Sequence, residues 1–147
     1  MKVVIQRVKS AMVIREENKS IVGEIKSGLF VLLGIKKGDT KKQADEIINK
    51  MVKLRIMADE EGKMNLSVID TKSEILLVSQ FTLYANTKDG NRPSFMEAEE
   101  PLKAKIIYEY IVESLQEKNV KVATGSFGDY MKIDCVLDGP VTLVLEN

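Results

Sequence analysis

The 147-residue chain contains no histidine, and this absence excludes several kinds of active site. A Ser-His-Asp or Cys-His nucleophile system needs an imidazole base, so neither can form within the chain. A zinc site made of histidine and cysteine ligands is excluded as well, because Cys135 is the only cysteine. Any catalysis would therefore use carboxylates, lysines, a divalent cation held by carboxylates, or backbone hydrogen-bond donors.

Disulfides and long apolar runs are missing too. A single cysteine cannot form an internal disulfide, and it fits a reducing compartment. No apolar run approaches the roughly 20 residues that cross a bilayer. Lys2 and Arg7 are not followed by the apolar segment of a signal peptide. We expect a cytoplasmic protein without membrane contact, folded as a single domain over residues 1–147.

The chain also lacks an excess of either charge, since 22 basic residues balance 22 acidic ones. A protein that binds nucleic acid without regard to sequence is usually basic, because phosphate neutralisation drives such binding. Any RNA contact would therefore be local. Some basic residues could form such a patch, although lysines and arginines ordinarily just solvate a surface: Lys41, Lys42, Lys88, Arg92, Lys103 and Lys105.

What the chain does have is strand-like patterning interrupted by two amphipathic helices. Alternating or continuously apolar runs predict strands over residues 2–8, 11–15, 20–26, 29–35, 73–81, 120–123, 131–137 and 141–145. Thr40 and Gln43 form a capping-box pattern that starts one helix, and a second helix is predicted from about Glu97 to Lys118. Residues 58–64 read as a loop or hairpin. This order predicts an α+β fold, an antiparallel β-sandwich or barrel with both helices packed on one face.

Ser79-Gln80-Phe81-Thr82 is the first candidate site, because two hydroxyls and an amide stand where a buried strand meets the polar loop 85–95. In a continuing strand, Ser79 and Phe81 face one way and Gln80 and Thr82 the other. Backbone N–H groups at such a strand end can form an oxyanion hole. The alternative is an ordinary strand end, where these residue types are common.

Gly139-Pro140 is the second candidate, because it interrupts two apolar strands directly after Asp138. It is either a simple turn before the last strand or a binding tip that presents two neighbouring carbonyls. Cys135 reads as an inert core thiol on one strand face rather than as a nucleophile. The run Asp59 to Glu61 could hold a cation, but such a run is ordinarily a solvated loop.

The two candidate motifs resemble the signatures of the D-aminoacyl-tRNA deacylases. The segment 79–84, Ser-Gln-Phe-Thr-Leu-Tyr, is similar to the first signature, and 139–142, Gly-Pro-Val-Thr, is similar to the second. The segments 6–8, 90–95 and 124–128 also resemble the family, so the similarity spans the chain in the expected order. One position departs from the family pattern, because Leu137 stands where an asparagine is common.

The resemblance implies an ester hydrolase that removes D-amino acids from tRNA in translation proofreading, with no cofactor and no metal. Its partners would be the 3′ end of aminoacyl-tRNA and a second copy of the chain, with the active site at the subunit interface. Ser79, Gln80, Phe81 and Thr82 would line the pocket around the ester. Gly139-Pro140 would be cis and enter the neighbouring pocket, with Arg7 holding this tip in place.

The implied chemistry needs no histidine. The 2′-hydroxyl of the substrate, or a water that it positions, would assist the attack, and N–H groups near Gln80 and Phe81 would stabilise the oxyanion. Thr82 is expected to position the ester rather than attack it, because no base partner is evident. The Gly139 and Pro140 carbonyls would bind the α-amino group and exclude L side chains, so glycyl-tRNA would also be cleaved.

Two other functions remain open from the sequence. One is a hydrolase of small D-amino esters or peptides that does not recognise RNA, which the zero net charge would suit. The other is a non-catalytic dimeric binding module, which a chain without histidine would suit.

Overall fold

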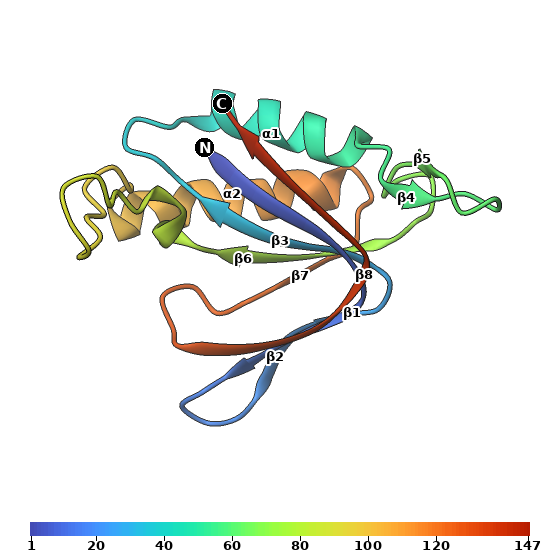
Figure 1. Cartoon of the computed structure of the whole chain (residues 1–147), viewed down its shortest axis with the longest axis horizontal. Helices are drawn as coiled ribbons and strands as arrows, with labels where there is room; N and C mark the ends of the chain where they lie inside the picture. Colours follow the sequence, from blue (N-terminus) through green and yellow to red (C-terminus); the bar gives the residue numbers. More distant parts are fainter.

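The computed structural model describes residues 1–147 and contains eight strands, two α-helices and one short 3-10 helix (Figure 1). In chain order the elements are β1 (Lys2–Arg15), β2 (Ile21–Ile25), β3 (Gly28–Gly34), α1 (Lys41–Lys53), β4 (Met57–Ala58), β5 (Met64–Leu66), β6 (Glu74–Ser79), η1 (Phe81–Tyr84), α2 (Pro101–Glu117), β7 (Val122–Thr124) and β8 (Met131–Glu146). Neither helix is both long and apolar enough to span a bilayer.

The main sheet has six strands in the order β2-β1-β3-β6-β7, with β8 paired along the length of β1. It curls until β2 and β7 approach each other, and a Cβ atom at Gly23 would lie 2.1 Å from the carbonyl oxygen of Thr124. Only glycine fits that approach. The sheet therefore nearly closes into a barrel, which together with two helices confirms the α+β prediction.

The sheet is mixed rather than purely antiparallel. β1 pairs antiparallel with β2, β3 and β8, whereas β3–β6 and β6–β7 are parallel. Each parallel pair is joined by a crossover that contains a helix, α1 in the first case and α2 in the second, as parallel neighbours require. The sequence pattern placed the helices correctly but did not reveal that each one connects two adjacent strands.

Both helices cover the same side of the sheet, as Figure 1 shows, and enclose the larger apolar core. The Thr40 capping box forms as predicted, because Thr40 Oγ1 accepts from Lys42 N at 3.2 Å and Gln43 Oε1 accepts from Thr40 N at 3.0 Å. α2 begins at Pro101, four residues later than expected. Glu100 is extended, as a residue before proline prefers, and the preceding segment pairs with the loop after β3.

A smaller core fills the opposite face of the curled sheet, inside the barrel. It contains Val8, Ala11, Val13, Ile25, Phe30, Leu76 and Val78. β3 and β6 contribute to both cores, so their continuous apolar sequences match burial on both faces. The strands expected at 2–8 and 11–15 are one strand, β1, and those at 131–137 and 141–145 are one strand, β8. The segment 58–64 forms the turn of the β4–β5 hairpin.

Candidate active site

The Ser79-Gln80-Phe81-Thr82 segment lies where β6 ends and η1 begins. Gln80 N donates to Leu33 O at 2.7 Å, which is the last bond to the sheet, and Phe81 to Tyr84 then turn into the 3-10 helix. The strand alternation expected across Ser79 to Thr82 is therefore wrong, because the chain leaves the sheet after Ser79. The turn changes which backbone groups are available.

Two consecutive N–H groups are left without an acceptor at this turn. Gln80 N is bound to Leu33 O, and Leu83 N donates to Gln80 O at 3.3 Å. The N–H groups of Phe81 and Thr82 lie between them in the first turn of the 3-10 helix, where an N–H has no acceptor within the helix, and neither donates to a loop residue or a side chain. The candidate oxyanion donors are therefore these two, rather than the N–H groups of Gln80 and Phe81 that the sequence suggested.

A cavity of about 850 Å³ opens beside this turn. Ser79, Gln80 and Phe81 line it, and the segments 95–101 and 127–131 form much of the rest of its wall. Phe81 packs edge-on against Phe95, with ring centroids 5.1 Å apart, although its side chain remains 54% exposed. Most of the lining residues are hydrophobic, so the cavity combines an apolar wall with a few polar groups, as small-molecule sites do.

Thr82 is exposed and is not among the residues that line this cavity. Its hydroxyl accepts a hydrogen bond from Gln80 Nε2, which fixes the amide of one residue against the hydroxyl of the other. The Thr82 hydroxyl has no hydrogen bond to a basic side chain, which is the contact that activates a hydroxyl nucleophile.

Gly139-Pro140 forms a bulge in β8. Gln6 pairs with Thr142 and Val8 pairs with Leu137, so the single residue Arg7 of β1 lies opposite the four residues 138–141. The Gly139-Pro140 bond is cis, as the family resemblance implied, and both residues are exposed. They do not line the cavity at Ser79 in their own chain.

Arg7 is the residue of β1 that supports this tip. It is 9% exposed, its Nη1 donates to Ile56 O at 2.7 Å, and its Nε lies 3.0 Å from Asp138 Oδ2 in an ion pair. Gly139 has a φ of 117°, and a Cβ there would lie 2.9 Å from Val141 Cγ2 and 3.3 Å from Arg7 Nη2. The tip therefore needs glycine for its backbone angle and for its close contact with Arg7.

Arg15 is a site-forming residue that sequence reasoning missed. Its Nη2 donates to Ser126 Oγ at 2.6 Å, and its Nε lies 2.8 Å from Asp129 Oδ2. Both partners belong to the turn 126–129, which forms part of the cavity wall. Tyr130, which follows this turn, is held by a hydrogen bond from Glu16 N to its carbonyl oxygen at 3.0 Å. The only signal for this turn was its likeness to a family segment, and nothing local pointed to a partner more than 100 residues away.

Glu99 is a second missed residue of the cavity wall. Its carboxylate accepts from the backbone N–H groups of Glu100 and Gly38, and these bonds hold its pKa below the ordinary value of 4.5. Lys103 and Lys37 add a smaller contribution in the same direction. Glu99 therefore stays ionised and ties the loop after β3 to the start of α2.

The other sequence candidates take ordinary structural places. Asp59 accepts from Glu61 N, Lys63 N and Asn65 Nδ2, which closes the β4–β5 turn and lowers its pKa, with the Asn65 bond the largest cause. No three His, Cys, Asp or Glu side chains gather as a metal site would require. Cys135 is exposed, so its expected core location is wrong: it lies on β8, an edge strand that pairs only with β1.

Two of the basic residues singled out from the sequence contact other side chains of the chain. Lys41 lies over the ring of Tyr110, 4.5 Å from its centroid, and Lys105 lies 3.7 Å from Glu109. Lys37, which the sequence did not single out, is the one lysine that lines the cavity at Ser79. Positive charge near the cavity is therefore local and mixed with carboxylates.

Comparison with known proteins shows the family of the chain. Residues 4–146 match the model of a protein family described as D-Tyr-tRNA(Tyr) deacylase. The chain is 52% identical to the D-aminoacyl-tRNA deacylase of Thermosipho melanesiensis, covering 100% of this chain and 97% of that protein. It is 50% identical to the D-aminoacyl-tRNA deacylase of Aquifex aeolicus, covering 100% and 98%.

Solved structures show the same fold. A protein described as c-Myc DNA unwinding element binding protein superposes with a TM-score of 0.92 at 38% identity, covering 100% of this chain and 99% of that one. A probable eukaryotic D-amino acid tRNA deacylase superposes with a TM-score of 0.77 at 15% identity, and that likeness concerns the fold alone. The chain therefore belongs to the D-Tyr-tRNA(Tyr) deacylase family, and its activity is that of a D-aminoacyl-tRNA deacylase.

Proposed function

We propose that the ester of D-aminoacyl-tRNA is hydrolysed in the cavity at Ser79 to Phe81, with the free N–H groups of Phe81 and Thr82 as the oxyanion site. These two unpaired donors are the observation that carries the proposal. Water attacks the ester carbonyl, the oxygen of the tetrahedral intermediate accepts from the donors, and the ribose oxygen leaves with a proton. One donor of this kind is worth roughly 2.7–4 kcal/mol in the transition state.

The substrate supplies the group that the chain lacks. The chain has no histidine, and the Thr82 hydroxyl is engaged by Gln80. The neighbouring 2′-hydroxyl of the terminal ribose lies next to the ester and positions the attacking water. Thr82 then holds the Gln80 side chain against the turn. Thr82→Ala is expected to lower kcat less than tenfold, whereas complete loss in a folded variant would make Thr82 the nucleophile.

The tip acts on a second copy of the chain. Gly139 and Pro140 are exposed and lie outside the cavity of their own chain, so they can meet a cavity only in a partner. In a homodimer with two-fold symmetry each tip enters the other subunit's cavity. Exposed apolar side chains on the same strand, Val136, Leu137 and Val144, are the kind that such an interface covers.

Complementation tests the action in trans. Gly139→Val damages the tip and Phe81→Ala damages the cavity, so a refolded equal mixture contains some dimers with one undamaged site. The mixture should reach roughly one quarter of wild-type activity, which exceeds the sum of the two variants alone. Activity no greater than that sum would place tip and cavity in the same chain. Sedimentation would show the dimer directly.

The tip also provides the selection for D-amino acids. Its two carbonyls bind the α-amino group, and an L side chain collides with the tip while a D side chain points away. Glycine has no side chain to reject, so glycyl-tRNA, including glycine mischarged on tRNA(Ala), is a substrate. Purified protein that cleaved D-tyrosyl-tRNA but left glycyl-tRNA intact would contradict selection by rejection alone. Pro140→Ala is expected to weaken the preference for D over L.

The macromolecular partner is the 3′ end of aminoacyl-tRNA, which places the protein in the cytoplasm where tRNA is charged. Comparing D-tyrosyl-tRNA with the ethyl ester of D-tyrosine separates this function from that of a small-ester hydrolase. Phosphate contacts make only the tRNA reaction markedly salt-dependent. Equal rates and equal salt dependence for both substrates would favour the small-ester hydrolase, and no cleavage of either would favour a binding module.

A further inference from the structure

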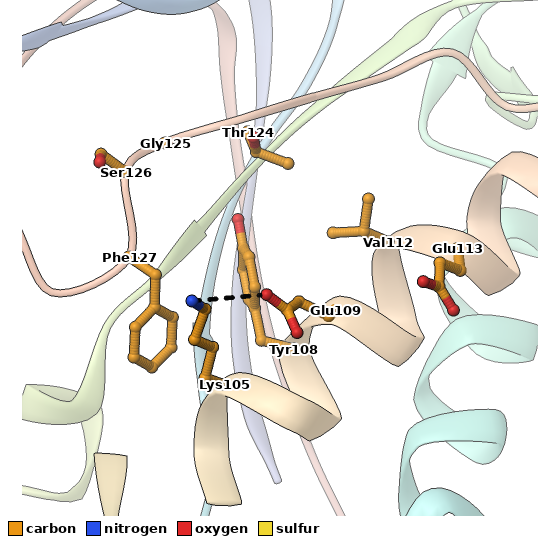
Figure 2. A pocket seen from close by; sticks show the side chains of 9 residues that line it. All are labelled: Lys105, Tyr108, Glu109, Val112, Glu113, Thr124, Gly125, Ser126 and Phe127. Atoms are coloured by element: carbon orange, nitrogen blue, oxygen red, sulfur yellow. Dashed lines mark ion pairs between the residues drawn. The ribbon is translucent and has the colours of Figure 1, made fainter. Parts of the chain in front are cut away.

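A second cavity, of about 520 Å³, lies between α2 and the segment that follows β7 (Figure 2). The helix contributes polar side chains on successive turns, and the facing segment contributes hydroxyls and one ring. The residues that matter are Lys105, Glu109 and Glu113 from α2, Thr124 at the end of β7, and Ser126 and Phe127 from the segment. The proposed hydrolysis does not use this groove.

The groove continues the active-site cavity. Phe127 lines both the groove and the active-site cavity. The wall formed by α2 is also continuous between them, because Ala104 lines the cavity whereas Lys105 and Glu109 line the groove. Five residues of helix separate Ala104 from Glu109, a rise of about 7.5 Å. That distance suits the next unit of a chain whose last unit occupies the active-site cavity.

The groove offers a cation and an anion to one ligand. The Lys105 ammonium and the Glu109 carboxylate are 3.7 Å apart, and both side chains are more than half exposed at 53% and 56%. An exposed pair at this separation is weak and can open toward a ligand. The N–H groups of Phe127 and Gly128 donate to no atom of the chain, which adds two donors at the junction with the active site.

This combination matches a nucleotide whose base carries an amine. Lysine and free backbone N–H groups bind phosphate oxygens, and a glutamate accepts from the N4 amine of cytosine. Phe127, half-buried and 5.7 Å from the Tyr108 ring, offers a face on which a base can stack. Uracil has a carbonyl oxygen where cytosine has the amine, so the same carboxylate disfavours it.

We propose that this groove binds the cytidine that precedes the terminal adenosine of tRNA, with its phosphate at Lys105 and its base amine at Glu109. The proposal rests on the proposed function, because the adenosine ester must occupy the cavity at Ser79. It makes the groove a binding site for RNA in a chain with no net charge, and it adds affinity through one nucleotide rather than through a basic surface.

The test compares three minimal substrates of the full-length protein: D-tyrosyl-adenosine, and the same ester extended at its 5′ side by cytidylyl or by uridylyl. The cytidylyl extension should raise kcat/KM about tenfold, as expected for charge-assisted hydrogen bonds, and the uridylyl extension should raise it less. Glu109→Gln should abolish the preference for cytidylyl over uridylyl. Lys105→Met should reduce the gain from both extensions.

Matched controls lie further along the same helix. Glu117→Gln and Lys118→Met change exposed residues outside the groove and should keep the tenfold gain and the base preference. Equal kcat/KM for the three esters in wild type, or an unchanged preference in Glu109→Gln, would overturn the groove while leaving the deacylase function intact. Failure to cleave D-tyrosyl-adenosine and D-tyrosyl-tRNA would instead overturn the proposed function.

Discussion

The cavity at Ser79 and the tip at Gly139-Pro140 are built in opposite ways. The cavity is enclosed by several elements of one chain, and its turn is fixed by backbone hydrogen bonds to β3. The tip is an exposed bulge on an edge strand, fixed largely by one buried arginine. In the proposed dimer, the cavity is the rigid receptor on one subunit and the tip is a small, separately supported probe from the other.

The largest expected effect comes from adding one methyl group to the tip. Gly139→Ala places a Cβ 2.9 Å from Val141 Cγ2 on a residue with a φ of 117°, so the tip must shift. A displacement of the order of 1 Å near the reacting groups lowers kcat/KM by about 100-fold. Steady-state hydrolysis of D-tyrosyl-tRNA measures the loss.

Gly62→Ala is the matched control for this change. Gly62 also has a positive φ, 78°, but a Cβ there meets nothing within 4 Å, and it lies in the β4–β5 turn. It should lose stability through backbone strain and keep its kcat/KM. Equal losses of activity in the two variants would mean that the tip has no special role.

Arg7→Lys should have the next largest effect. A lysine cannot keep both the bond to Ile56 O and the ion pair with Asp138, because it is a single point charge without the arginine fork. Losing a hydrogen bond of a mostly buried charged group costs about 2 kcal/mol. Thermal unfolding measures the stability, and the ratio of D- to L-tyrosyl-tRNA cleavage measures the tip.

Arg15→Lys sharpens the comparison, because Arg15 supports the cavity wall as Arg7 supports the tip. A lysine there cannot keep both the bond to Ser126 and the pair with Asp129, so the turn 126–129 is held less firmly. KM should rise while the preference for D over L stays. If Arg15→Lys changed the preference for D over L as much as Arg7→Lys does, the cavity and the tip would not be supported independently of each other.

Smaller effects on stability are expected from removing the hydroxyls of two buried tyrosines. Tyr108 Oη donates to Leu77 O at 2.7 Å, whereas Tyr84 Oη is buried without a partner. Tyr108→Phe should cost about 1 kcal/mol of unfolding free energy, and Tyr84→Phe should be neutral or stabilising. Urea unfolding of both variants measures the difference, and a comparable cost at Tyr84 would reveal a partner for its hydroxyl.

The smallest expected effect is the pH dependence of the stabilisation that Glu99 provides at the cavity wall. Backbone N–H groups lower the pKa of Glu99, so its stabilisation is present above the unfolded value of 4.5 and is lost as pH falls through the folded pKa. Glu99→Gln should melt slightly below wild type at pH 7, and the gap should close in acid below 4.5. A gap that persisted there would assign the stabilisation to contacts other than the carboxylate charge.

Much of the fold was predictable because its signals are local. The capping box at Thr40 and the doubly buried run of β3 each lie within a few residues of sequence. The strand alternation across Ser79 to Thr82 failed because Gln80 makes its last sheet bond to Leu33, which lies far away in the chain. Cys135 was misplaced for a related reason: alternation shows that a strand has two faces, but not whether a layer covers them.

Composition and local patterning were enough to exclude histidine chemistry, to predict the α+β class and to identify the two motifs, and the family resemblance predicted that the motifs work together. Long-range packing decided which backbone groups are available beside the cavity, because Leu33 takes the N–H of Gln80 and leaves those of Phe81 and Thr82 free. It also joined Arg15 to residues 126–129 and set a groove beside the active-site cavity. Composition and spacing show which functional groups a chain contains, whereas long-range packing decides which of these groups remain unpaired and which lie close together.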